Sequence, residues 1–133
     1  MLKMIPLFFL LLLGYFSLHA VGFFPEYLYV SMFTIELPSG EIWQPTYGDA
    51  FMILGLGTLF VEVYKSTQTT DSSIVEHVLS TMVLIIFLVL WLIEPWAGNT
   101  YFAMLALMSL FDVTAGFTVT IAVARRDFQV GTG

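Results

Sequence analysis

Four long apolar runs, separated by shorter polar stretches, dominate the pattern of this chain. The first run contains no Asp, Glu, Lys or Arg. The second, from Ala50 to Tyr64, is interrupted only by Glu62, and the fourth only by Asp112. A helix needs about 20 mostly apolar residues to cross a bilayer. The pattern therefore predicts four transmembrane helices, at residues 4–24, 47–66, 74–93 and 100–124.

Helix-start signals support two of these boundaries. Thr46 and Asp49 fit a capping box, in which the two side chains bond each other's backbone N–H groups. Ser73 and Glu76 repeat the pattern before the third run. Both pairs favour a helix that starts just before the apolar residues begin.

The first run has an alternative interpretation as a secretory signal peptide. Lys3 precedes an apolar core, and Ala20-Val21-Gly22 fits a small-x-small cleavage site. The apolar run is longer than a usual signal core, so we predict a retained helix.

Composition places the chain among membrane proteins. Only 11% of its 133 residues are charged, against about 25% in a soluble domain. The net charge of −6 argues against nucleic-acid binding, which uses clustered basic residues. The absence of cysteine excludes disulfides, thiol catalysis and thiolate metal sites. We predict an all-α membrane protein, with one integral domain over residues 1–133.

The positive charges predict the orientation. Lys3, Lys65, Arg125 and Arg126 are the chain's Lys and Arg residues, and with four passes they all fall on one side of the membrane. The positive-inside rule makes that side cytoplasmic. Both termini, including a polar tail at residues 125–133, should therefore be cytoplasmic.

The opposite side carries the tryptophans and a segment with a different period. Trp43, Trp91 and Trp96 are expected to act as interfacial anchors there. Within residues 26–45, Tyr27 to Glu36 alternates like a strand, and Leu37-Pro38-Ser39-Gly40 signals a turn. We predict a short extracytoplasmic β-hairpin. Because an isolated hairpin is marginal in water, it should pack on helix ends, lipid headgroups or a partner.

Asp112 is the first candidate for chemistry, because it lies near the middle of the fourth predicted helix. A charge at that depth costs about 2.5–3.5 kcal/mol even on a mild insertion scale. It should therefore face protein or trapped water, on a stripe of small and polar residues that includes Ser109 and Gly116. Asp112 can serve as a proton or cation carrier, or as a buried group that joins helices; both interpretations stay open.

Further polar residues are expected near Asp112. The second and third helices are antiparallel neighbours, so Glu62 and His77 should lie at similar depth and could pair. Such a pair either relays protons or holds the two helices together. Ser80 lies on the face of His77, and depth matching makes Thr58 a hydroxyl partner for Asp112. His19 and His77 fall on opposite sides of the membrane, so we expect no metal site and no cofactor.

The chain resembles a family of uncharacterised small four-pass bacterial inner-membrane proteins over residues 35–128. The resemblance rests on these segments: Glu36-Leu37-Pro38-Ser39-Gly40 with Trp43, Gly48-Asp49, the ten residues from Phe111 to Thr120, and Ala124-Arg125-Arg126-Asp127-Phe128. It implies a bacterial cytoplasmic membrane, but no activity or site residue to transfer. Small multidrug transporters have a similar length, but they depend on a glutamate in the first helix, which residues 4–24 lack.

These patterns predict a non-enzymatic accessory or scaffolding subunit of a larger membrane complex. No nucleophile–base spacing, phosphate-binding loop or metalloprotease motif is present in the sequence. The partners should be the lipid bilayer and other membrane subunits or further copies of this chain, and not nucleic acid. The alternative is a small proton- or cation-coupled transporter or channel that uses Asp112.

Overall fold

The computed structural model describes residues 5–68 and 73–132. The helices are α1 (Leu7–Ala20), α2 (Tyr47–Ser66), α3 (Ser73–Ile93) and α4 (Thr100–Thr132), with a short 3-10 helix, η2 (Pro95–Ala97), between the last two. Strands β1 (Ile35–Glu36) and β2 (Ile42–Trp43) pair in antiparallel fashion. Among the described residues, α2, α3 and α4 are long and apolar enough to cross a membrane.

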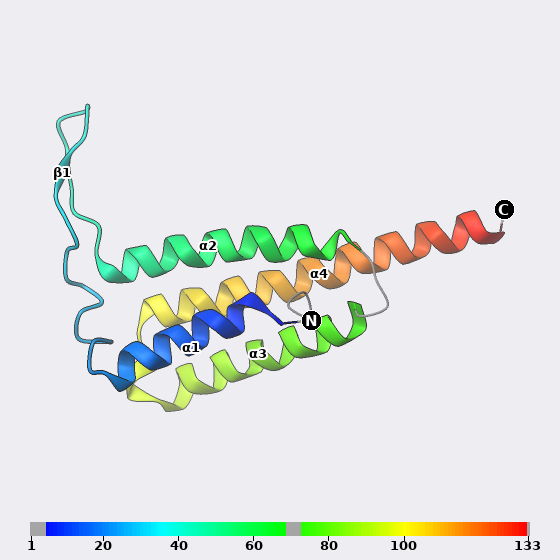
Figure 1. Cartoon of the computed structure of the whole chain (residues 1–133), viewed down its shortest axis with the longest axis horizontal. Helices are drawn as coiled ribbons and strands as arrows, with labels where there is room; N and C mark the ends of the chain where they lie inside the picture. Colours follow the sequence, from blue (N-terminus) through cyan, green and yellow to red (C-terminus); the bar gives the residue numbers. More distant parts are fainter. Residues whose placement is uncertain (1–4, 69–72, 133) are drawn as a thin grey trace.

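The four helices run side by side, with α4 packed along both α2 and α3 (Figure 1). The shorter α1 lies against α2 and α3. One end of the bundle carries the strands and the α3–α4 connection, and we call it the hairpin end. At the other end α2 finishes near Lys65, and we call it the Lys65 end; α1 begins and α4 finishes towards that end.

Helix α1 is shorter than the predicted span at residues 4–24. Its 14 residues correspond to about 21 Å of helix, below the ~30 Å of a hydrocarbon core. Gly22, at φ 81°, ends the helix early. The Gly22 N–H donates to the His19 carbonyl and the Phe23 N–H to the Leu18 carbonyl, which is the Schellman arrangement.

The predicted hairpin forms, but it is shorter than the alternating pattern indicated. Ile35 lies opposite Trp43, and the turn uses Gly40 at φ 92°. Residues 25–30 turn instead of extending, with the Tyr27 N–H bonded to the Phe23 carbonyl. The alternating pattern did not produce a strand here because Leu28 is buried in the core. This segment therefore follows the surface of the bundle.

Helix α4 continues to Thr132, whereas we predicted that it ends at residue 124 and that 125–133 is a tail. Residues 125–130 contain neither glycine nor proline, so nothing in that sequence breaks the helix.

The predicted capping box at the start of α2 is present: the Asp49 N–H donates to Thr46 Oγ1 (3.1 Å) and the Thr46 N–H to Asp49 Oδ2 (2.9 Å). Ser73, the other predicted cap, begins α3, but its side chain is outside the part of the chain that the structure describes.

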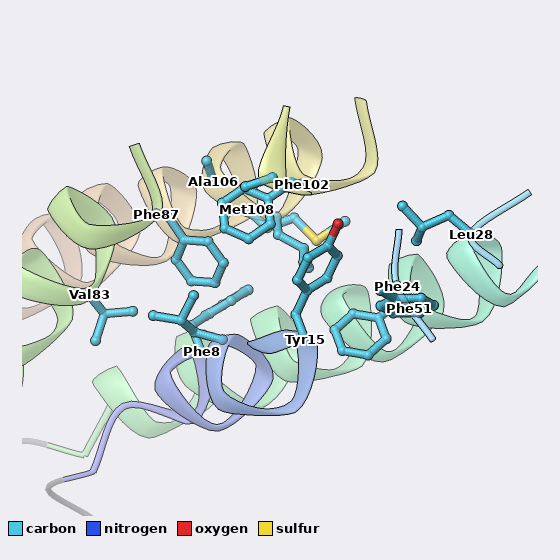
Figure 2. Packing of buried hydrophobic residues seen from close by; sticks show 13 residues of the cluster. Phe8, Tyr15, Phe24, Leu28, Phe51, Val83, Phe87, Phe102, Ala106 and Met108 are labelled. Carbon is cyan, nitrogen blue, oxygen red and sulfur yellow. The ribbon is translucent and has the colours of Figure 1, made fainter. Parts of the chain in front are cut away.

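An aromatic cluster around Tyr15 forms much of the core (Figure 2). The Tyr15 ring lies 5.0 Å from that of Phe102 and 5.1 Å from that of Phe24, centroid to centroid. Its hydroxyl donates to the Trp96 carbonyl and accepts from Asn99 Nδ2, both at 2.9 Å. Tyr15 therefore joins α1 to the α3–α4 connection and keeps its own polar atom satisfied inside the core.

Candidate functional site

A polar cavity lies at the Lys65 end of the bundle. The centre of a water molecule can occupy about 20 Å³ of it, and roughly 10–15 Å³ is needed for one water. The cavity therefore has room for one or two waters, but not for an organic substrate. It is lined by Ile5, Pro6, Glu62, Lys65, Ser66, Glu76, His77, Ser80, Asp112 and Gly116.

Asp112 contributes a carboxylate to this cavity from α4. The residue is only 5% exposed. Within the described part of the chain no hydrogen bond reaches its carboxylate, although every fully enclosed side-chain nitrogen or oxygen there has a partner. The carboxylate must therefore face the open volume of the cavity. An unpartnered acid in this position is unusual, because a buried charge normally requires a counter-ion or a hydrogen bond.

Glu62 plays a different part, because its carboxylate anchors the start of α1. Its Oε1 accepts from the Leu7 N–H and from Lys65 Nζ, both at 3.1 Å. Lys65 Nζ also donates to the Ile5 carbonyl at 3.3 Å. The first N–H groups of a helix have no partner within the helix, and a carboxylate at that point is favoured by the helix dipole. Glu62 thus satisfies the free end of α1 at the edge of the polar cavity.

His77 bonds to α4 and not to Glu62. Its Nε2 lies 2.7 Å from Thr120 Oγ1, and its ring packs on Phe117 at 4.6 Å between centroids. The predicted direct Glu62–His77 pair is therefore wrong for this structure. Gly116 leaves the space that the ring fills, because a Cβ there would lie 3.1 Å from His77 Cε1. Glu62 and His77 nevertheless line the same cavity, as their expected common depth implied.

The remaining candidates divide between cavity and core. Ser80 lines the cavity, whereas Ser109 is buried one turn of α4 away from Asp112 and does not line it. Thr58 neither lines the cavity nor bonds Asp112 among the described residues. The reason is the rotation of α2, which buries Gly55 and Glu62 and leaves Thr58 half-buried beside them.

Sequence reasoning missed the pairing of Lys65 and the contribution of the segment before α1. Lys65 lies three residues after Glu62, and that spacing places both on one helix face. The pairing of Lys65 with Glu62 could therefore have been predicted from the sequence. The approach of Ile5 and Pro6 to the cavity could not have been predicted, because it depends on where α1 begins.

The predicted anchors lie at the hairpin end in two different settings. Trp43 and Trp91 are exposed. Trp96 is half-buried, and its ring stacks on His19 at 4.7 Å between centroids. Trp96 thus contributes to core packing as well. No three His, Asp or Glu side chains lie close enough to hold a metal ion within residues 5–68 and 73–132.

Comparison with family models, with curated proteins and with solved structures finds no match to this chain. The family resemblance given above therefore remains a prediction.

Proposed function

We propose that this chain is a non-enzymatic accessory or scaffolding subunit of a larger membrane protein complex. The observation that supports this is the hairpin, which extends to the side of the bundle beyond α2 and across the direction of the helices (Figure 1). Its apolar side chains are exposed there: Met32, Phe33, Ile35, Leu37, Ile42 and Trp43.

The exposed hairpin requires a covering surface. Apolar area left in water costs about 25 cal/mol per Å², and a two-stranded hairpin is marginal by itself. Exposed apolar side chains on the helices need no such explanation, because lipid covers them. The hairpin is beyond the reach of its own bundle, so a neighbouring molecule must supply the surface.

Charge favours a protein over an anionic lipid surface as that neighbour. Glu36 and Glu41 flank the turn, and the sequence has no Lys or Arg between residues 4 and 64. Anionic headgroups attract basic segments and repel acidic ones. We therefore infer a partner that presents an apolar face with neutral or basic edges beside α2, at the hairpin end.

Photocrosslinking tests this inference. Ile42 in β2 and Ile53 in α2 are matched in type and exposure, at 64% and 58%. Benzoylphenylalanine placed at Ile42 should crosslink to one protein of defined mass in native membranes, while the same probe at Ile53 should give lipid adducts or a weaker pattern. Lipid adducts alone from Ile42, with recovery of a lone monomer in mild detergent, would contradict the proposal. A product of twice the chain mass would identify a second copy as the partner.

The orientation belongs to the same proposal. We place the Lys65 end in the cytoplasm and the hairpin outside, in a bacterial inner membrane crossed four times. Because the chain contains no cysteine, single substitutions can be labelled without background. An impermeant maleimide should modify Ser39→Cys in intact cells and Gln68→Cys only after permeabilisation. The reverse result would invert the proposed orientation.

The cavity gives a reason to keep transport through Asp112 as a second candidate. Transport requires access from both sides, yet the apolar core fills the bundle between the cavity and the hairpin end. Flux measurements in proteoliposomes separate the two functions. Proton or cation flux that Asp112→Asn abolishes would favour the transporter, and equal flux in both proteins would exclude it.

A further inference from the structure

We propose that Asp112 and its cavity form a hydrated proton-binding site that is entered from the Lys65 end alone. In this site the carboxylate accepts a proton from a hydronium ion in the cavity, giving a carboxylic acid and a water molecule, and the reverse step returns the proton. The proposal concerns binding and does not depend on the accessory function argued above.

Among the described residues, the charges around the cavity leave Asp112 as the buried acid without a counter-ion. From α2, Lys65 faces the cavity but lies 3.1 Å from Glu62, so this pair is already neutral. From α3, Glu76 and His77 line the cavity, and His77 Nε2 is already bonded to Thr120. The described residues before α1 add no charged side chain. A charge that is buried without a partner is expensive in this environment, so a mobile positive charge should be attracted to Asp112.

The size of the cavity favours a proton over a metal cation. Hard cations such as Ca²⁺ and Mg²⁺ take six or more oxygen ligands, whereas a volume of about 20 Å³ holds only one or two waters. A proton carried by water satisfies Asp112 without further ligands.

The position of the cavity limits access to one side. Lys65 and Ser66 form the last residues of α2, and Glu76 lies in the first turn of α3, so the polar lining continues to the Lys65 end. On the other side of Asp112, α4 presents Met108, Leu105 and Phe102 to the core. Water therefore has a polar route to Asp112 from one end only.

Substituted-cysteine labelling tests access. Ser109→Cys is the matched control, because Ser109 is equally buried on the same helix but does not line the cavity. Silver ion, a thiol-reactive probe close to a water molecule in size, should modify Asp112→Cys from the Lys65 end and leave Ser109→Cys unmodified. Modification from both ends, or of neither variant, would overturn the proposal.

A second measurement follows the titration of the native chain, and a substituted protein serves only to assign the signal. The sequence contains four aspartates, so ¹³Cγ-aspartate NMR in nanodiscs gives few signals, and the signal missing from Asp112→Asn belongs to Asp112. This signal should shift with pH and should not move when sodium replaces choline at constant pH and ionic strength. A sodium-dependent shift would identify a cation site instead, and a signal that never moves with pH would exclude proton binding.

Discussion

A glycine-to-alanine substitution at position 48 tests the packing of the hairpin end. A Cβ on Gly48 would lie 2.6 Å from Tyr101 Cε2 and 2.9 Å from the Leu28 carbonyl oxygen. Favourable carbon–carbon contacts begin at about 3.5 Å, so the added methyl group overlaps by nearly 1 Å. Tyr101 cannot swing away freely, because its hydroxyl donates to Asp49 Oδ1 at 3.1 Å and lies 3.2 Å from Thr46 Oγ1.

The expected magnitude follows from these contacts. Overpacking of this kind costs about 1–3 kcal/mol. Glycine-to-alanine changes in a helix return about 0.5–1 kcal/mol of backbone propensity, but position 48 lies in the first turn, where that gain is smallest. Gly48→Ala should therefore lower the free energy of unfolding by roughly 1–2 kcal/mol.

Gly57→Ala on the same helix is the matched control. Nothing lies within 4 Å of a Cβ at that position, so only the propensity gain of about 0.5–1 kcal/mol should remain. Unfolding in mixed dodecylmaltoside–SDS micelles, followed by circular dichroism, measures both free energies. The two substitutions should move stability in opposite directions. Equal effects, or a stabilised Gly48→Ala protein, would refute the packing described at the start of α2.

Three further substitutions probe other contacts with the same unfolding assay. Tyr15→Phe should cost about 1–3 kcal/mol, since it removes the hydroxyl bonded to Trp96, and a change near zero would contradict that bond's importance. Gly22→Ala should cost about 1–2 kcal/mol because an L-residue must take a left-handed conformation; an unchanged protein would show that the end of α1 adjusts freely. Glu62→Gln should cost roughly 1–3 kcal/mol, and the loss should shrink in a Lys65→Met background; additive losses would mean that the pair is not coupled.

Much of the helical architecture could be predicted from the sequence, because a long apolar run indicates a helix long enough to cross a bilayer. The capping box at Thr46 could also be predicted, since Asp49, which completes it, lies only three residues away in the chain. The end of α1 was harder to predict. Gly22 interrupts an apolar run that continues on both sides, so hydropathy alone does not mark the left-handed turn there.

The candidate site was harder to predict from the sequence than the helices were. The residue types were available from the sequence, since polar groups inside apolar runs are rare and must face protein or water. The partners of these residues could not be predicted, because the depth of two residues along their helices does not fix how each helix is rotated about its own axis. Thr58 and Glu62 both lie on α2 near the expected level, yet the rotation of that helix turns only Glu62 into the cavity.

The two buried acids of the cavity therefore have separate physical roles. Glu62 is required where a helix starts among apolar groups, since Leu7 there needs an acceptor and Lys65 balances the charge. Asp112 satisfies no donor among the described residues, so its charge contributes nothing to folding that an amide could not replace. A buried charge without a partner is costly, so its removal should be neutral or stabilising. Asp112→Asn should therefore leave the fold as stable as before or more stable, while Glu62→Gln weakens it.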